Sequence, residues 1–63
     1  MCYFVEEQED GSWDVHADEA DRDSASGIRS KYAAIDRAKS LIDRYHDQGE
    51  VIVKYLNGKT ELA

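Results

Sequence analysis

Three side chains in this sequence are of the types that form a nucleophile and its base. Cys2 is the only cysteine, and the two histidines are His16 and His46. A thiol needs a neighbouring base to become an effective nucleophile, and His16 falls on the same predicted sheet face as Cys2. This single match at a strand end is a weak indication of catalysis. His46 is expected in the last turn of a helix, where a cationic side chain suits the helix dipole. We therefore predict that the chain is not an enzyme.

A second pattern, Asp21-x-Asp23, resembles the start of a calcium-binding loop. An EF-hand loop needs an oxygen ligand two residues further on, then glycine, and finally glutamate at position twelve. Those positions hold Ala25, Ser26 and Tyr32, so the pattern fails. The sequence also lacks a glycine-rich phosphate loop and a Cys/His cluster for zinc. It therefore predicts neither a metal nor a cofactor.

The acidic residues are the most informative chemical feature, because they are distributed unevenly. The formal net charge is −6. Residues 1–23 hold nine acids and one base, for a net of −8, whereas residues 24–63 hold five acids and seven bases, for a net of +2. The simpler explanation of these acids is that they keep a small protein soluble. Adaptation to a salty habitat is a poorer explanation, because a halophilic protein should spread its acids over the whole surface. The nine N-terminal acids are Glu6, Glu7, Glu9, Asp10, Asp14, Asp18, Glu19, Asp21 and Asp23.

These acids begin on a predicted β-hairpin. Residues 2–8 and 12–17 alternate between apolar and polar side chains, and Asp-Gly within the sequence between them favours a hairpin turn. A three-residue loop at residues 9–11 places Val5 opposite Val15 and so aligns the apolar sets. We prefer this register to that of a two-residue loop for that reason.

Either register places two carboxylates face to face. Asp14 lies opposite Glu6 with the three-residue loop and opposite Glu7 with the two-residue loop. Like charges directly opposite each other destabilise a hairpin, so reversing either Glu6 or Asp14 to lysine should raise stability by a few tenths of a kcal/mol. A small domain that retains such repulsion suggests a functional reason for it.

The rest of the chain predicts a loop, a helix and a second hairpin. Residues 17–29 are polar and without periodicity, as in a loop, and Ser30 is a good N-cap for a helix over residues 31–47. Gly49 is placed to end that helix in a left-handed cap. Residues 50–56 read as a strand, followed by an Asn-Gly turn and a return strand over 59–62. The apolar stripe of the helix is Ala34, Ile35, Ala38, Leu41, Ile42 and Tyr45.

A two-residue Asn-Gly loop pairs Lys54 with Glu61 and Val53 with Leu62. The predicted fold is α+β, one domain over residues 1–63 with the element order ββαββ. We expect a four-stranded antiparallel sheet of order 2-1-3-4 with the helix packed on one face. The other face is left open to solvent or to a partner.

Large apolar residues divide between the two faces of this sheet. Trp13 and most of the tyrosines fall on the core face, and a small core needs such large side chains. The other face carries Phe4, Ile52 and Leu56. An exposed apolar patch of this kind often marks a partner or dimer interface.

Several short segments resemble a family of small bacterial proteins known as domain of unknown function 2188. The matching segments are Asp10-Gly11-Ser12-Trp13-Asp14-Val15, Ser30-Lys31 with Ala34-Ile35 and Ala38-Lys39, Gly49-Glu50-Val51-Ile52-Val53 and Asn57-Gly58-Lys59. The resemblance supports this fold but supplies no activity, because the family itself has none assigned. The sequence departs from the family between Asp18 and Asp23, where a more mixed and often basic segment is expected.

Composition and charge together favour a binding protein of the cytoplasm. No segment has the roughly 18 apolar residues of a membrane helix, and the start of the chain does not resemble a signal peptide. A net negative charge argues against direct binding to nucleic acid. We predict an acidic, nucleic-acid-mimicking inhibitor that occupies the basic nucleic-acid-binding surface of a partner protein. It is similar by class to small acidic phage inhibitors such as anti-CRISPR proteins. The alternative is an interaction module of unknown role that self-associates through the open sheet face. For the chain in general we expect a monomer or a weak homodimer.

Overall fold

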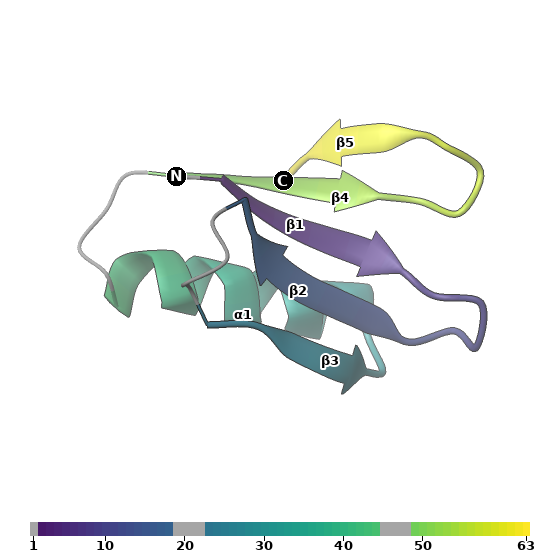
Figure 1. Ribbon diagram of the computed structural model, residues 1–63, viewed down its shortest axis with the longest axis horizontal. Helices are drawn as coiled ribbons and strands as arrows, with labels where there is room; N and C mark the ends of the chain where they lie inside the picture. Colours follow the sequence, from purple (N-terminus) through teal and green to yellow (C-terminus); the bar gives the residue numbers. More distant parts are fainter. Residues whose placement is uncertain (1, 19–22, 45–48) are drawn as a thin grey trace.

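The computed structural model describes residues 2–18, 23–44 and 49–63, and shows an α+β fold (Figure 1). In the described residues one helix packs against a five-stranded mixed sheet with the strand order β3-β2-β1-β4-β5. The elements in chain order are β1 (Cys2–Glu7), β2 (Trp13–Ala17), β3 (Ala25–Ile28), α1 (Lys31–Arg44), β4 (Glu50–Lys54) and β5 (Thr60–Leu62).

The first hairpin, β1 with β2, has the predicted three-residue loop and register. Val5 lies opposite Val15, which confirms that apolar matching sets the alignment. The backbone N–H of Gln8 donates to the carbonyl of Ser12 at 2.9 Å, and that of Gly11 donates to the carbonyl of Gln8 at 3.1 Å. Gly11 has a φ of 86°, a left-handed conformation that glycine adopts without steric cost.

The predicted loop over residues 17–29 is wrong in part, because Ala25–Ile28 forms β3 at the edge of the sheet. Ala25 lies opposite Val15 and Ile28 opposite Trp13. The partners are two residues apart on β2 but three apart on β3, so the pairing contains a bulge. A bulge breaks the period-two alternation, which explains why this segment carries no strand pattern in the sequence.

The extra strand also overturns the predicted antiparallel four-stranded sheet. β1 and β4 are neighbours, as predicted, but they run parallel. Each antiparallel step reverses the chain, so β3 adds one reversal before the helix. The strand that follows the helix, β4, therefore runs in the same direction as β1 and not opposite to it. The sheet is mixed for this reason.

The second hairpin, β4 with β5, has the same three-residue loop as the first. The N–H of Tyr55 donates to the carbonyl of Lys59 at 2.9 Å, and that of Gly58 donates to the carbonyl of Tyr55 at 3.0 Å. Gly58 has a φ of 89° and takes the place that Gly11 has in the first hairpin. The predicted two-residue loop is therefore wrong.

This longer loop shifts the register of β5 by one residue. A shift of one residue moves every side chain of a strand to the other face. Leu62, expected on the core face, is 68% exposed. The predicted pairs of Lys54 with Glu61 and Val53 with Leu62 are replaced by Lys54 with Thr60, Val53 with Glu61 and Ile52 with Leu62.

The helix begins as predicted. The hydroxyl of Ser30 accepts a hydrogen bond from the N–H of Ala33 at 3.3 Å, which satisfies one of the free donors at the helix start. The described helix ends at Arg44. The predicted continuation to residue 47, with Tyr45 on its apolar face and the cap at Gly49 after it, depends on residues 45–48, which lie outside the described residues.

The core lies between α1 and the sheet. Trp13 is 9% exposed and is buried as predicted. Ala34 and Ala38 are fully buried, and such small side chains let a helix lie close to a sheet. No helix in the described residues has the length and hydropathy to cross a membrane. The buried apolar residues are Tyr3, Val5, Trp13, Val15, Ala34, Ala38, Leu41, Ile42, Val51 and Val53.

Candidate protein-interaction surfaces

The sheet face away from α1 carries a row of side chains across four strands. His16 on β2 is opposite Phe4 on β1, Phe4 is beside Ile52 on β4, and Ile52 is opposite Leu62 on β5. Phe4 and Ile52 are half-buried and Leu62 is exposed. We call this row, His16-Phe4-Ile52-Leu62, the open-face row.

Polar contacts hold the β1 part of this face in place. The Phe4 ring lies 5.4 Å from the His16 ring, and the Lys54 ammonium is 4.2 Å from its centroid. Nε2 of His16 donates a hydrogen bond to Oε1 of Glu6. Phe4 is therefore partly covered by charged and polar neighbours, and the apolar surface extends mainly over Ile52 and Leu62.

Of the three residues predicted for this face, Leu56 is not in the row. It follows β4 in the turn of the second hairpin and is 57% exposed. Its backbone N–H donates to Oε1 of Glu7 at 3.1 Å, which ties the two hairpin ends together. Leu62 takes the place expected of Leu56. The three-residue loop of the second hairpin causes this exchange, and the Asn-Gly dipeptide, which favours a two-residue loop, concealed it in the sequence.

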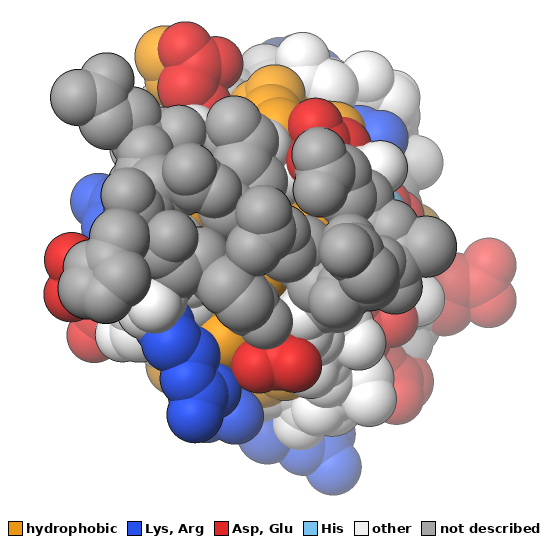
Figure 2. All heavy atoms as spheres, turned by 60° about the vertical axis from the view of Figure 1, so that its left-hand side comes forward, with side chains coloured by type: hydrophobic (Ala, Val, Ile, Leu, Met, Phe, Trp, Pro, Cys, Tyr) orange, Lys and Arg blue, Asp and Glu red, His pale blue; other side chains and the backbone are white. Residues whose placement is uncertain are grey.

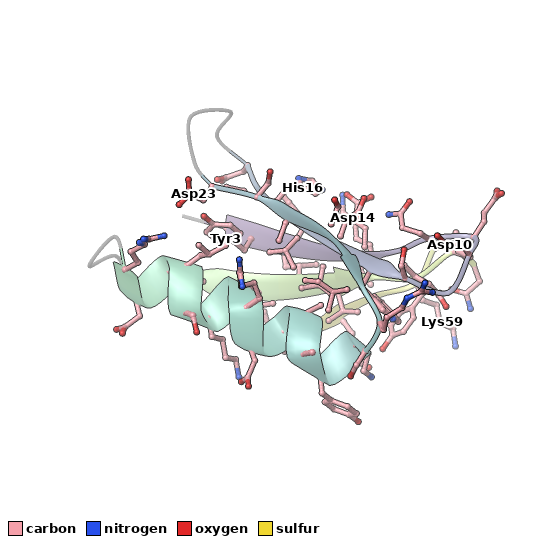
Figure 3. All side chains as sticks on the ribbon, turned by 90° about the horizontal axis from the view of Figure 1, so that it is seen from below. Tyr3, Asp10, Asp14, His16, Asp23 and Lys59 are labelled. Carbon is pink, nitrogen blue, oxygen red and sulfur yellow. The ribbon has the colours of Figure 1, made fainter. Side chains whose placement is uncertain are left out.

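The end of the first hairpin gathers carboxylates from both strands and the loop. They line one shallow groove together with Leu56 from the neighbouring hairpin. Figure 3 shows Asp10 at this end of the molecule and Asp14 on the sheet side away from α1. We call this set the acidic tip; its members are Glu6, Glu7, Glu9, Asp10 and Asp14.

Within the acidic tip, Asp10 is the carboxylate with the most contacts. Its Oδ1 accepts hydrogen bonds from the N–H of Ser12 at 2.9 Å and from the hydroxyl of Ser12 at 2.6 Å. These bonds, with a smaller contribution from the charge of Arg29, lower the pKa of Asp10 below its ordinary value. Asp10 is therefore ionised at neutral pH and holds the loop in shape.

The remaining N-terminal acids do not extend the acidic tip. Asp18 lies at the opposite end of the hairpin, where its N–H bonds to the carbonyl of Cys2. Asp23 pairs with Arg44 through Oδ2 and Nη1 at 3.2 Å. Figure 2 views this end of the molecule, where both acidic and basic side chains are visible. Glu19 and Asp21 lie outside the described residues.

The thiol of Cys2 is not activated by its surroundings. Burial, followed by the nearby carboxylates of Asp18 and Glu50, raises the pKa of the thiol. Nε2 of His16 is engaged with Glu6, and His46 lies outside the described residues. Among residues 2–18, 23–44 and 49–63, no three His, Cys, Asp or Glu side chains are placed to hold a metal ion.

A polar network that the sequence did not reveal links the helix to the last strand. Nζ of Lys31 donates to the Tyr55 hydroxyl at 3.1 Å, and that hydroxyl donates to Oε1 of Glu61 at 3.1 Å. The bond to Tyr55 raises the pKa of Lys31. The Tyr55 ring also packs edge-on against Trp13, with centroids 5.9 Å apart. This network fixes the position of the second hairpin beside the acidic tip.

Comparison of the chain with models of protein families, with curated proteins and with solved structures found no match.

Proposed function

We propose that this chain is a non-enzymatic binding protein whose acidic tip occupies the basic, nucleic-acid-binding surface of a partner protein and so inhibits it. The observation that supports this most directly is that five carboxylates line one shallow groove. Elsewhere in the described residues some acids pair with bases, as Asp23 does with Arg44 and Glu61 with Lys31. A surface of one sign raises the rate of encounter with a surface of the opposite sign.

The spacing of the acidic tip suits mimicry of a nucleic-acid backbone. Glu6 and Asp14 lie opposite each other on neighbouring strands, which are about 4.8 Å apart. Phosphates of a duplex recur at about 3.4 Å of axial rise along each strand, so the two sets of charges are spaced on a similar scale. Three of the five carboxylates are held in place by hydrogen bonds. His16 contacts Glu6, the N–H of Leu56 contacts Glu7, and Ser12 contacts Asp10.

The test uses a variant that removes charge without disturbing the loop. In Glu9→Gln/Asp10→Asn, the amide oxygen of residue 10 still accepts from Ser12, as Asn57 Oδ1 accepts from the N–H of Lys59 at 3.0 Å in the second hairpin. The matched control is Asp36→Asn/Asp43→Asn, which neutralises two exposed carboxylates on the helix. Both variants change the net charge by the same amount.

The immobilised chain is exposed to a bacterial lysate at about 50 and 200 mM salt, with and without short duplex DNA. The expected result is capture of nucleic-acid-binding proteins at low salt, release by high salt and competition by the duplex. The tip variant should lose capture and the helix variant should keep it. Capture that is indifferent to salt, to the duplex or to the tip variant contradicts the proposal, as does the absence of nucleic-acid-binding proteins from the captured set.

A further inference from the structure

The open sheet face has a regular arrangement of charged and apolar positions. Each position is fixed by strand pairing, so the face can be described as three rows running from β2 to β5. The first row begins with two residues of the acidic tip and consists of Asp14, Glu6, Lys54 and Thr60. The second row is the open-face row. The third row consists of Asp18, Cys2 and Glu50.

This arrangement complements itself under a two-fold rotation. Consider an axis parallel to the strands and midway between β1 and β4, with two copies stacked face to face. The rotation exchanges β1 with β4 of the other copy and keeps each row at its own level. Glu6 then opposes Lys54 of the second copy, and Phe4 opposes Ile52 of the second copy. By symmetry, each of these contacts occurs twice.

We propose that the open sheet face binds a second copy of this chain in this two-fold arrangement. Complementary charges fix the alignment, because Glu6 and Lys54 oppose each other reciprocally. Phe4 and Ile52 lie beside the axis at the centre of the interface, and Leu62 lies towards its edge, opposite His16 of the second copy. Aligned packing of two sheets about 10 Å apart at roughly −30° is the usual geometry for such faces.

A dimer of ordinary size would use most of the open sheet face. A stable interface buries about 800 Å² on each partner, roughly a fifth of the 4213 Å² accessible surface of the chain. The molecule measures 31 × 20 × 20 Å. The open sheet face is one of its large faces (Figure 1), because α1 covers only the other side of the sheet.

The other two-fold axis in the plane of the face, perpendicular to the strands, fits less well. It keeps each strand opposite itself and exchanges the first row with the third. Lys54 then opposes Glu50 of the second copy, which is favourable, but Asp14 opposes Asp18 and Glu6 opposes Cys2. The one favourable charge contact is offset by the one between like charges. Like charges brought together across an interface are unfavourable. The axis parallel to the strands is therefore the one that the charges support.

This proposal does not rest on the partner proposed for the acidic tip, although the dimer interface takes up two residues of the tip, Glu6 and Asp14. Rotation about an axis parallel to the strands leaves both hairpin ends pointing the same way. Two acidic tips then lie at one end of the dimer, while Glu9 and Asp10 stay outside the interface. The variant Glu9→Gln/Asp10→Asn should therefore leave dimerisation unchanged, which separates a failure of one proposal from a failure of the other.

The decisive experiment uses two charge reversals, singly and mixed. Glu6→Lys places lysine opposite Lys54 of the second copy, and Lys54→Glu places glutamate opposite Glu6. Each should weaken the homodimer about tenfold or more. In a mixture, the Glu6→Lys chain has lysine at both positions 6 and 54, and the Lys54→Glu chain has glutamate at both. Each lysine of the first chain then opposes a glutamate of the second. We expect a heterodimer that is tighter than either variant homodimer, measured by native mass spectrometry with one chain isotopically labelled.

Mixing separates the proposed contact from effects within one chain. Glu6 and Lys54 are also neighbours on adjacent strands, so each reversal creates a like-charge pair inside its own chain, and mixing cannot relieve that pair. The matched controls are Asp36→Lys and Lys39→Glu on the exposed side of α1, which should leave the dimer unchanged. Leu62→Asp, at a site 68% exposed in one chain, should abolish the dimer and keep the fold.

Two results would overturn the proposal. One is a wild-type chain that stays monomeric by sedimentation up to about 1 mM, the weakest affinity that would still count as specific. The other is a mixture of the two reversals that associates no better than the single variants.

Discussion

Glu6 and His16 are diagonal neighbours on the open sheet face, and Nε2 of His16 donates a hydrogen bond to Oε1 of Glu6. Asp14 lies opposite Glu6 on β2, and Lys54 lies beside it on β4. The carboxylate of Glu6 therefore has a donor and a cationic neighbour that offset its repulsion from Asp14. The two facing carboxylates predicted from the sequence are therefore present. Of the two, Glu6 has compensating contacts within the described residues and Asp14 has none.

This difference separates two substitutions that the sequence treated alike. Asp14→Lys replaces a carboxylate beside Glu6 with a cation, so the free energy of unfolding should rise by a few tenths of a kcal/mol. Glu6→Lys removes the hydrogen bond from His16 and puts two lysines side by side with residue 54. It should lower the free energy of unfolding by about 0.5–1.5 kcal/mol. Urea denaturation at neutral pH measures both.

The measurement is made at low protein concentration, so that self-association does not contribute to stability. His16→Gln is a useful companion, because it removes the imidazole and keeps Glu6. His16→Gln should lower the free energy of unfolding by less than Glu6→Lys does. Equal gains in stability from Glu6→Lys and Asp14→Lys would show that the bond from His16 does not offset the repulsion.

Trp13 should be essential for folding. Its side chain is 9% exposed and packs edge-on against Tyr55. Trp13→Ala should cost about 3–5 kcal/mol, which matches the whole stability of about 3–5 kcal/mol that a core of this size supplies. Circular dichroism should therefore show a largely unfolded chain. Tyr32→Ala, at an aromatic residue 75% exposed, is the control and should melt like the wild type.

The two hairpins show how far local sequence predicts register. Both have a three-residue loop that ends in a glycine with positive φ, Gly11 in one and Gly58 in the other. In the first hairpin, several apolar residues on both strands decide the alignment. In the second, β5 offers only Leu62 as an apolar guide, and the Asn-Gly dipeptide favours a shorter loop than the one that forms.

The missed strand had a larger effect than the missed register. Ala25–Ile28 carries few strand-forming residues and pairs through a bulge, so no local pattern marks it. Its presence reverses the direction of everything that follows, including β4. The nine N-terminal acids illustrate the same limit, because the sequence places them close together along the chain. Strand direction decides that Asp18 and Asp10 lie at opposite ends of the sheet.

The pH dependence of stability should report on Asp10. Hydrogen bonds from Ser12 hold the pKa of Asp10 below its ordinary value of 3.8. A carboxyl whose pKa is lower in the folded state stabilises the fold fully above its unfolded pKa and loses that effect as the pH falls through its folded pKa. The wild type should therefore lose part of its stability as the pH drops below about 4, and Asp10→Asn should lose less over the same range.

Urea denaturation at a series of pH values from about 2 to 6 measures this slope. Asp43→Asn, on the exposed side of the helix, removes a carboxylate for which no equivalent contact is described and serves as the control. The contribution of Asp10 is the difference in slope between the Asp10→Asn and Asp43→Asn chains. An Asp10→Asn chain with the slope of the Asp43→Asn chain would show that Asp10 does not contribute to the acid sensitivity.

The last prediction tests the register of β5 through Leu62. In the structure this side chain is 68% exposed and lies opposite Ile52 on the open sheet face. Leu62→Lys should therefore change the free energy of unfolding of the single chain by less than about 0.5 kcal/mol. Val53→Thr changes the size and shape of the side chain much less than Leu62→Lys does, but Val53 is fully buried. That substitution should cost about 1–3 kcal/mol, because the core offers the new hydroxyl no solvent. If Leu62 lay on the core face beside Val53, as a two-residue loop would place it, the order of the two effects would be reversed.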